Sequence, residues 1–436
     1  MADVERSILL ERFEKYADSI TPEQVYTAFK ANWAGLETPQ LYLSTSEVIE
    51  NAEEVMMKAL EESRAVAVQP LASVEKVDFN YTDFGNPGKI ASRETVEDIA
   101  FEQILFENNV RLNIKKTPYQ KDVISIDIAL GKGALFFPED LPGFKWFAPN
   151  MLSLAGLQAH SADEIQTMMA GKSVGTSINF GTRRMYMSGA TVPENLGDQL
   201  NLMAAYATAP GYRPEAKIRY DNYIQSFYPT LDSTPGGVAA KEVERLIRSG
   251  DTRFGYPEEE DLINIEMNSL KTWLEPKLSS SAIEIGVVGD VDAEKVIQQV
   301  ARTFGALPKV DANIPSIEGK DVSLEFPNGS NRPIKRSHAG ESGTALLRTY
   351  WPAPDGRDVT TSRRVSMLTQ LFKLRLTEVM REEEGASYSP SAFSYTPRIY
   401  PDYGYIAASL ELDPKDIDRI SAKVDEIAAE FREGKF

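Results

Sequence analysis

Few side chains in this sequence could carry out catalysis or bind a metal ion. The chain has no cysteine, and its only two histidines are His160 and His338. The lack of cysteine excludes disulfides, thiolate nucleophiles and thiolate metal sites. The two histidines lie far apart in the sequence, and neither has a His or Glu at the spacing of a metal-binding motif. Hydrolysis at a metal held by these histidines is therefore not expected.

One stretch occupies a position where many folds place functional residues. Residues 143–151, GFKWFAPNM, follow a strand pattern and an acidic loop, and they open an apolar run typical of a buried helix. Pro149 lies inside this run and would kink the helix or delay its start. Trp146 is most simply a core aromatic residue, and the Asn150 amide could bond backbone that the proline leaves free. The stretch therefore fits an active site, the remains of one, or ordinary core.

The charge and composition limit the classes of partner. Among 436 residues, 65 are acidic and 47 are basic, which gives a net charge of −18. Nucleic-acid binding needs a basic face, so no nucleic-acid partner is expected. No apolar run approaches the length of a membrane span, and the charged N-terminus lacks the apolar core of a secretory signal. We expect the bacterial periplasm if an export signal lies upstream, and otherwise the cytoplasm.

The length predicts two or more domains. Residues 1–70 read as amphipathic helices around one short strand, which is too little to form a sheet. We interpret this segment as the helical tail of a preceding domain. Residues 71–103 are predicted to be a linker.

Two α+β units are expected next, at residues 104–278 and 279–436. Residues 124–130 alternate apolar and polar, as in a half-buried strand, and a strand ending at Gly289 opens the second unit. Each unit runs strand, helices, hairpin and a helix started by proline. This order predicts two duplicated α/β-sandwich domains, mainly antiparallel sheet packed with helices. The second is expected to be incomplete at its C-terminal end.

Two segments resemble the insulinase/pitrilysin-type zinc metallopeptidases. Residues 284–308, EIGVVGDVDAEKVIQQVARTFGALP, resemble that family's strand, Gly-Asp turn and helix closing with Phe-Gly-x-Leu-Pro. Residues 375–389, RLTEVMREEEGASYS, resemble its Arg-Glu…Gly-x-x-Tyr segment. The resemblance extends from about residue 104 to the C-terminus. Residues 1–70 resemble the close of a preceding family domain.

The resemblance implies that this chain has lost the zinc site. Active members carry an inverted motif, His-x-x-Glu-His, and a Glu on a second helix as third ligand. In the matching frame this sequence has Trp146, Pro149 and Asn150, none of which can replace those ligands or the general base. The third-ligand region, residues 217–227, contains no Glu. No cofactor is therefore expected in this chain, and zinc is expected in a partner half.

The resemblance also implies a role for the half that lacks zinc. Family members generally enclose a peptide between two homologous halves, and the degenerate half supplies an Arg and a Tyr near the metal. Arg381 and Tyr388, seven residues apart, match that spacing. A guanidinium and a phenol are suitable hydrogen-bond donors for a scissile carbonyl or its oxyanion.

Our leading hypothesis is thus a non-catalytic half of a zinc metallopeptidase. Its partners would be a peptide substrate and a zinc-bearing homologous half, on the same polypeptide or on a separate chain. The alternative is a non-catalytic assembly or binding scaffold related to structural subunits of the family. A third reading, metal-free hydrolysis by this chain, would require peptidase activity that survives a chelator.

Overall fold

The computed structural model describes residues 6–17, 19–33, 40–45, 48–67, 78–327, 333–385 and 389–435. Contacts divide the chain into two compact units, Met1–Glu75 and Lys76–Phe436, which are described separately. No helix in the described ranges is long and apolar enough to cross a membrane.

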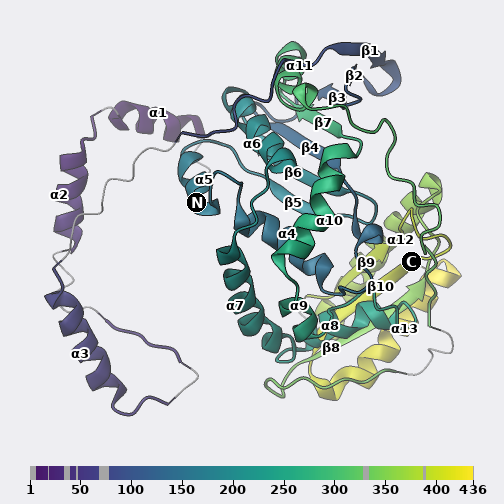
Figure 1. Ribbon diagram of the computed structural model, residues 1–436. Helices are drawn as coiled ribbons and strands as arrows, with labels where there is room; N and C mark the ends of the chain where they lie inside the picture. Colours follow the sequence, from purple (N-terminus) through teal and green to yellow (C-terminus); the bar gives the residue numbers. More distant parts are fainter. Residues whose placement is uncertain are drawn as a thin grey trace. The chain divides into compact units, whose positions relative to one another are not determined.

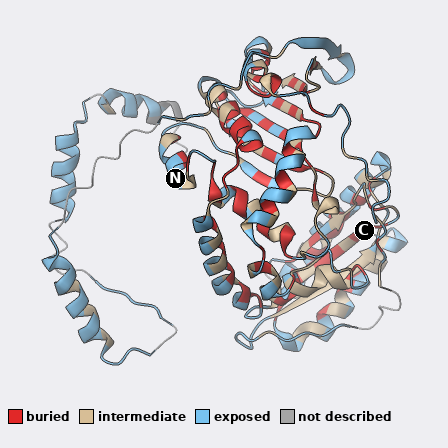
Figure 2. Cartoon of the chain, in the orientation of Figure 1, coloured by how far each residue is buried: buried red, intermediate tan, exposed pale blue. Residues whose placement is uncertain are grey.

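The N-terminal unit contains helices in which no described side chain is buried. They are α1 (Arg6–Ala17), α2 (Pro22–Trp33) and α3 (Ala52–Ala65). No side chain of α2 or α3 is buried, and Trp33 is 61% exposed (Figure 2). The short strand predicted here does not form, since residues 40–45 belong to no helix or strand. A lone strand has no neighbour to take up its backbone hydrogen bonds.

A seven-stranded sheet forms the centre of the larger unit (Figure 1). Its strand order is β1-β2-β3-β7-β4-β6-β5, and every neighbouring pair is antiparallel except β3 and β7. The strands are β1 (Ile90–Val96), β2 (Phe101–Phe106), β3 (Arg111–Lys116), β4 (Ile124–Leu130), β5 (Ser177–Phe180), β6 (Met185–Thr191) and β7 (Glu284–Gly289).

Helices cover one face of this sheet. In β4, Ile124, Ile126 and Ile128 are buried, whereas Ser125 and Asp127 on the opposite face are exposed. This period of two confirms the half-buried strand that the sequence predicts. Buried residues gather where the sheet meets α4, α6 and α10 (Figures 1 and 2). The helices are α4 (Phe144–Ala155), α5 (Ala162–Met168), α6 (Leu196–Thr208), α7 (Pro214–Leu231), α8 (Pro235–Leu246), α9 (Glu259–Ile263), α10 (Met267–Ser280) and α11 (Ala293–Arg302).

The sheet does not follow the expected boundaries at residues 103–104 and 278–279. β7, expected to open a second unit, inserts between β3 and β4, and the residues of α11 join the same core. The apolar residues Ile285 and Val287 of β7 are fully buried on the helix-covered face, whereas Val288 on the opposite face is 43% exposed. Likewise β1 lies within the segment expected to be a linker and pairs with β2.

A second, smaller sheet has the order β8-β10-β9. It packs against α12 and α13, whose buried side chains include Phe372, Leu376, Ile420 and Val424. Its elements are β8 (Ala345–Pro352), α12 (Val359–Thr377), the π-helical segment η6 (Glu378–Glu383), β9 (Ser391–Tyr395), β10 (Tyr405–Leu412) and α13 (Ile417–Glu433). Helices packed on mainly antiparallel sheets confirm the predicted α+β class.

The two sheets share one order of elements. β4, α4, β5, β6 and α6 follow one another along the chain as β8, α12, β9, β10 and α13 do. Within the sheets, β4-β6-β5 corresponds to β8-β10-β9. The repeat read from the sequence is thus visible in the strand order.

A buried arginine joins the segment after α8 to the second sheet. Arg248 is 4% exposed, and its guanidinium lies 4.1 Å from the ring centre of Phe254 and 5.6 Å from that of Tyr403. It also donates a hydrogen bond of 2.7 Å to the carbonyl of Glu244. The Tyr403 hydroxyl donates to the carbonyl of Ile247 at 2.8 Å. This cluster ties the two layered parts of the unit together.

Replacing Arg248 tests that connection. We expect Arg248→Ala to lower the free energy of unfolding by about 3 kcal/mol, because buried hydrogen bonds and cation–π contacts are lost together. Urea denaturation followed by circular dichroism measures the change. Arg363→Ala, at an exposed position on α12, is the matched control and should change stability by less than about 0.5 kcal/mol. Equal effects of the two substitutions would contradict the role assigned to Arg248.

Candidate functional site

Helix α4 carries Trp146, Pro149 and Asn150. It begins at Phe144, ahead of the proline, and ends at Ala155; Gly156 follows with a φ of 64°, which favours glycine. A late helix start at Pro149 is therefore not observed. The helix packs against α7 and buries one broad face, formed by Phe144, Phe147, Ala148, Met151, Leu152 and Ala155.

Aromatic rings occupy the place between α4 and α7. The ring of Trp146 stacks on Tyr256, with 4.1 Å between centres and 9° between planes. Tyr256 in turn lies 6.0 Å from Phe227, and Phe227 stacks on Tyr223 at 5.2 Å. Phe227 and Tyr223 come from the region where the family resemblance implies a third ligand. We call Trp146, Tyr256, Phe227 and Tyr223 the aromatic stack.

The Asn150 side chain forms a hydrogen bond within the turn of α4 that contains Pro149. Pro149 has no N–H, so the carbonyl of Lys145 loses the donor that a regular helix would supply. The Asn150 side-chain amide donates to the next carbonyl, that of Trp146, at 2.8 Å. This hydrogen bond links Asn150 to the backbone of Trp146, so two of the three degenerate positions are in direct contact.

The side chains on α4 do not fit a zinc ion. An indole and a prolyl ring offer no suitable donor, and zinc is bound by thiolate, imidazole or carboxylate groups rather than by a carboxamide such as that of Asn150. Across the described ranges, no group of three or more His, Asp or Glu side chains could hold a metal. His160 is buried and accepts the Asn80 N–H at 3.0 Å, whereas His338 lies 3.1 Å from the Thr344 carbonyl. The two histidines therefore serve separate local contacts.

Lys145 is a neighbour that sequence patterns did not single out. Its ammonium lies 5.8 Å from the ring centre of Trp146 and 5.5 Å from that of Phe254. Burial lowers the pKa of Lys145 below its ordinary value, and the nearby Glu244 carboxylate partly opposes this shift. The environment of α4 is thus aromatic and poorly hydrated.

The second candidate position lies at the end of α12. There η6 continues the helix with π-helical hydrogen bonding, a rare geometry often found at functional sites. Val379 and Met380 are buried, whereas Arg381 is exposed. Within the described ranges, Arg381 has no hydrogen bond or ion pair. Tyr388 lies outside the described residues.

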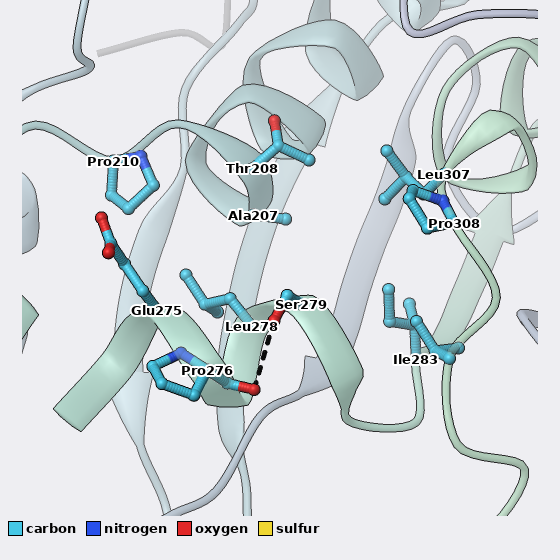
Figure 3. Close-up of a pocket in the computed structure, with 11 residues that line it drawn as sticks. Ala207, Thr208, Pro210, Glu275, Pro276, Leu278, Ser279, Ile283, Leu307 and Pro308 are labelled. Atoms are coloured by element: carbon cyan, nitrogen blue, oxygen red, sulfur yellow. Dashed lines mark hydrogen bonds between the residues drawn. The ribbon is translucent and has the colours of Figure 1, made fainter. Parts of the chain in front are cut away.

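A pocket of about 510 Å³ lies elsewhere, between the end of α6, the end of α10 and the segment after α11 (Figure 3). Its lining includes Leu278, Ile283 and Leu307, and Glu275 is its single charged lining residue. The Ser279 hydroxyl is held by the Pro276 carbonyl at 3.3 Å. None of its lining residues belongs to α4, α7 or η6. Because most of the lining is apolar, the pocket offers few groups that could take part in catalysis.

Comparison with known proteins supports the same reading. Residues 264–436 match the model of the peptidase M16 inactive domain. This C-terminal part of the chain is similar to that family. The resemblance to pitrilysin-type peptidases is thereby confirmed. No match was found among curated protein sequences.

Solved structures of M16 proteins share the fold. The periplasmic protease PqqL from Escherichia coli matches with a TM-score of 0.66 and 17% identity, over 98% of this chain and 49% of that one. An M16 inactive domain from Pseudomonas fluorescens gives 0.60 and 16%, over 77% and 80%. Pitrilysin gives 0.53 and 14%, over 80% and 38%. The chain thus spans about half the length of PqqL.

The aromatic stack makes a testable contribution to stability. We expect Trp146→Ala to lower the free energy of unfolding by about 2–3 kcal/mol, because a half-buried indole and its stacking on Tyr256 are removed. Chemical denaturation measures the difference. Trp33→Ala, at a side chain that is 61% exposed, provides the control with an expected change below about 0.5 kcal/mol. A negligible loss for Trp146→Ala would show that the stack does not hold α4 against α7.

Proposed function

We propose that this chain is the non-catalytic half of a zinc metallopeptidase. It encloses a peptide substrate together with a zinc-bearing homologous half, and it supplies Arg381 and Tyr388 to that half's active site. The partner half lies on the same polypeptide or on a second chain. The compartment proposed is the bacterial periplasm where an export signal precedes this segment, and otherwise the cytoplasm.

The state of Arg381 is the observation that carries this proposal. The side chain is exposed on η6, and no described residue takes up its five N–H donors. Neighbouring arginines on the same surface are engaged: Arg375 pairs with Glu378 at 3.0 Å, and Arg419 with Asp416 at 3.1 Å. An unpaired guanidinium beside several carboxylates is available for a ligand.

The lost motif on α4 supports the division of labour. Trp146 and Pro149 carry no group that could activate water, so hydrolysis requires chemistry from outside this chain. Zinc in the partner half would polarise the scissile carbonyl and activate a water molecule. Arg381 would then donate to the carbonyl oxygen, where negative charge develops during attack. The phenol of Tyr388 would donate to the same region.

Substitution of Arg381 tests the role directly. In the complex with the zinc-bearing half, we expect Arg381→Ala to lower turnover of a quenched fluorescent peptide by about 10²-fold, the scale of losing one oxyanion donor. Tyr388→Phe is expected to act in the same direction. Steady-state kinetics on both variants checks the expectation.

Arg364→Ala is the control, because Arg364 is an exposed arginine on α12 outside η6. It should leave turnover unchanged. If Arg381→Ala also leaves turnover unchanged while the complex still assembles, the catalytic contribution is refuted. The assembly scaffold then becomes the better account of the chain.

A further inference from the structure

Arg381 lies in a turn that is rich in carboxylates. We call residues 378–384, EVMREEE, the acidic turn; it holds Glu378, Glu382, Glu383 and Glu384 around the single arginine. Glu378 and Glu384 lie three residues before and after Arg381. On an α-helical surface, opposite charges at this spacing lie within reach of each other. Arg381 nevertheless has no hydrogen-bond or ion-pair partner among the described residues, and this needs a physical explanation.

Arg375 engages two of these carboxylates. Its Nη1 atom donates to Glu378 at 3.0 Å and to Glu383 at 3.3 Å. Its Nε atom donates to Glu430 of α13, also at 3.3 Å. One guanidinium thus connects the end of α12, the acidic turn and α13.

Arg419 engages a third carboxylate from the opposite side. It donates to Glu384 and, at 3.1 Å, to Asp416. Glu384 is consequently held toward the start of α13. Of the acidic turn's carboxylates, only Glu382 then lacks an arginine partner within the described ranges.

We infer that Arg375 and Arg419 are positioning residues that keep Arg381 available for substrate. They neutralise the carboxylates that would otherwise capture its guanidinium. The inference rests on the proposed function of Arg381. Exposed ion pairs are weak, so capture by one released carboxylate would reduce the free fraction of Arg381 by about fivefold at most.

A purely structural role for the two arginines predicts a different pattern of effects. In that case the ion pairs themselves hold η6 in shape, and losing either charge partner should be equally harmful. If the arginines act by occupying carboxylates, removing the carboxylates should be harmless. Glutamine variants of the acidic turn separate the two explanations, because glutamine keeps the size of the side chain and removes its charge.

The experiment uses the complex of this chain with its zinc-bearing half and a quenched fluorescent peptide. Arg375→Ala/Arg419→Ala should lower turnover by about fivefold to tenfold. Adding Glu378→Gln, Glu383→Gln and Glu384→Gln to that variant should restore turnover to within about twofold of wild type. The three glutamines alone should leave turnover unchanged, and this variant keeps the test decisive if the double alanine variant does not fold.

Three outcomes decide the matter. A loss in the triple glutamine variant as large as in the double alanine variant would show a structural role and overturn the inference. So would wild-type turnover of the double alanine variant while Arg381→Ala remains impaired. Wild-type turnover of Arg381→Ala would instead refute the proposed function. Arg364→Ala again serves as the control for loss of a positive charge on α12.

Discussion

The contact between α4 and α7 is the constraint on which this chain's chemistry depends. In a zinc peptidase of this family, ligands on two helices would meet at the metal. Here Trp146 of α4 stacks on Tyr256, and Tyr256 lies 6.0 Å from the tilted ring of Phe227 on α7. Stacked rings form no open coordination position for water.

The acidic turn combines a π-helical backbone with ion pairs from Arg375 and Arg419. The π-helical end of α12 buries Val379 and Met380 and so turns Arg381 outward. Arg375 then pairs with carboxylates on both the turn and α13. The individual ion pairs are exposed and contribute little to folding. These pairs occupy three carboxylates around Arg381, which has no partner among the described residues.

Local signals in the sequence predicted local structure well. The Asp292 side chain caps α11, and Thr21 and Gln24 form the capping box of α2, as residue types and spacing indicate. The alternation predicted for residues 124–130 is likewise confirmed in β4. Such features depend on neighbours within one turn or one strand.

Features that depend on distant segments escaped prediction. Nothing near β7 indicates that it inserts between β3 and β4, because both partners lie more than a hundred residues away along the chain. The partner of Trp146 was equally hidden, since Tyr256 sits in an irregular segment without periodicity. The absence of a zinc motif, by contrast, follows from residue types alone. Residue types near Trp146 therefore gave no sign of the ring that stacks on it.

The internal repeat shows where the second domain differs from the first. In the first, α7 packs on α4, and β4 has two sheet neighbours, β6 and β7. In the second, β8 has β10 as its single neighbour within the described ranges. The outer face of α12 exposes Met367, Leu371 and Leu374 at helical spacing, with Leu374 68% exposed. That the second unit, residues 279–436, is incomplete at its C-terminal end stays a prediction.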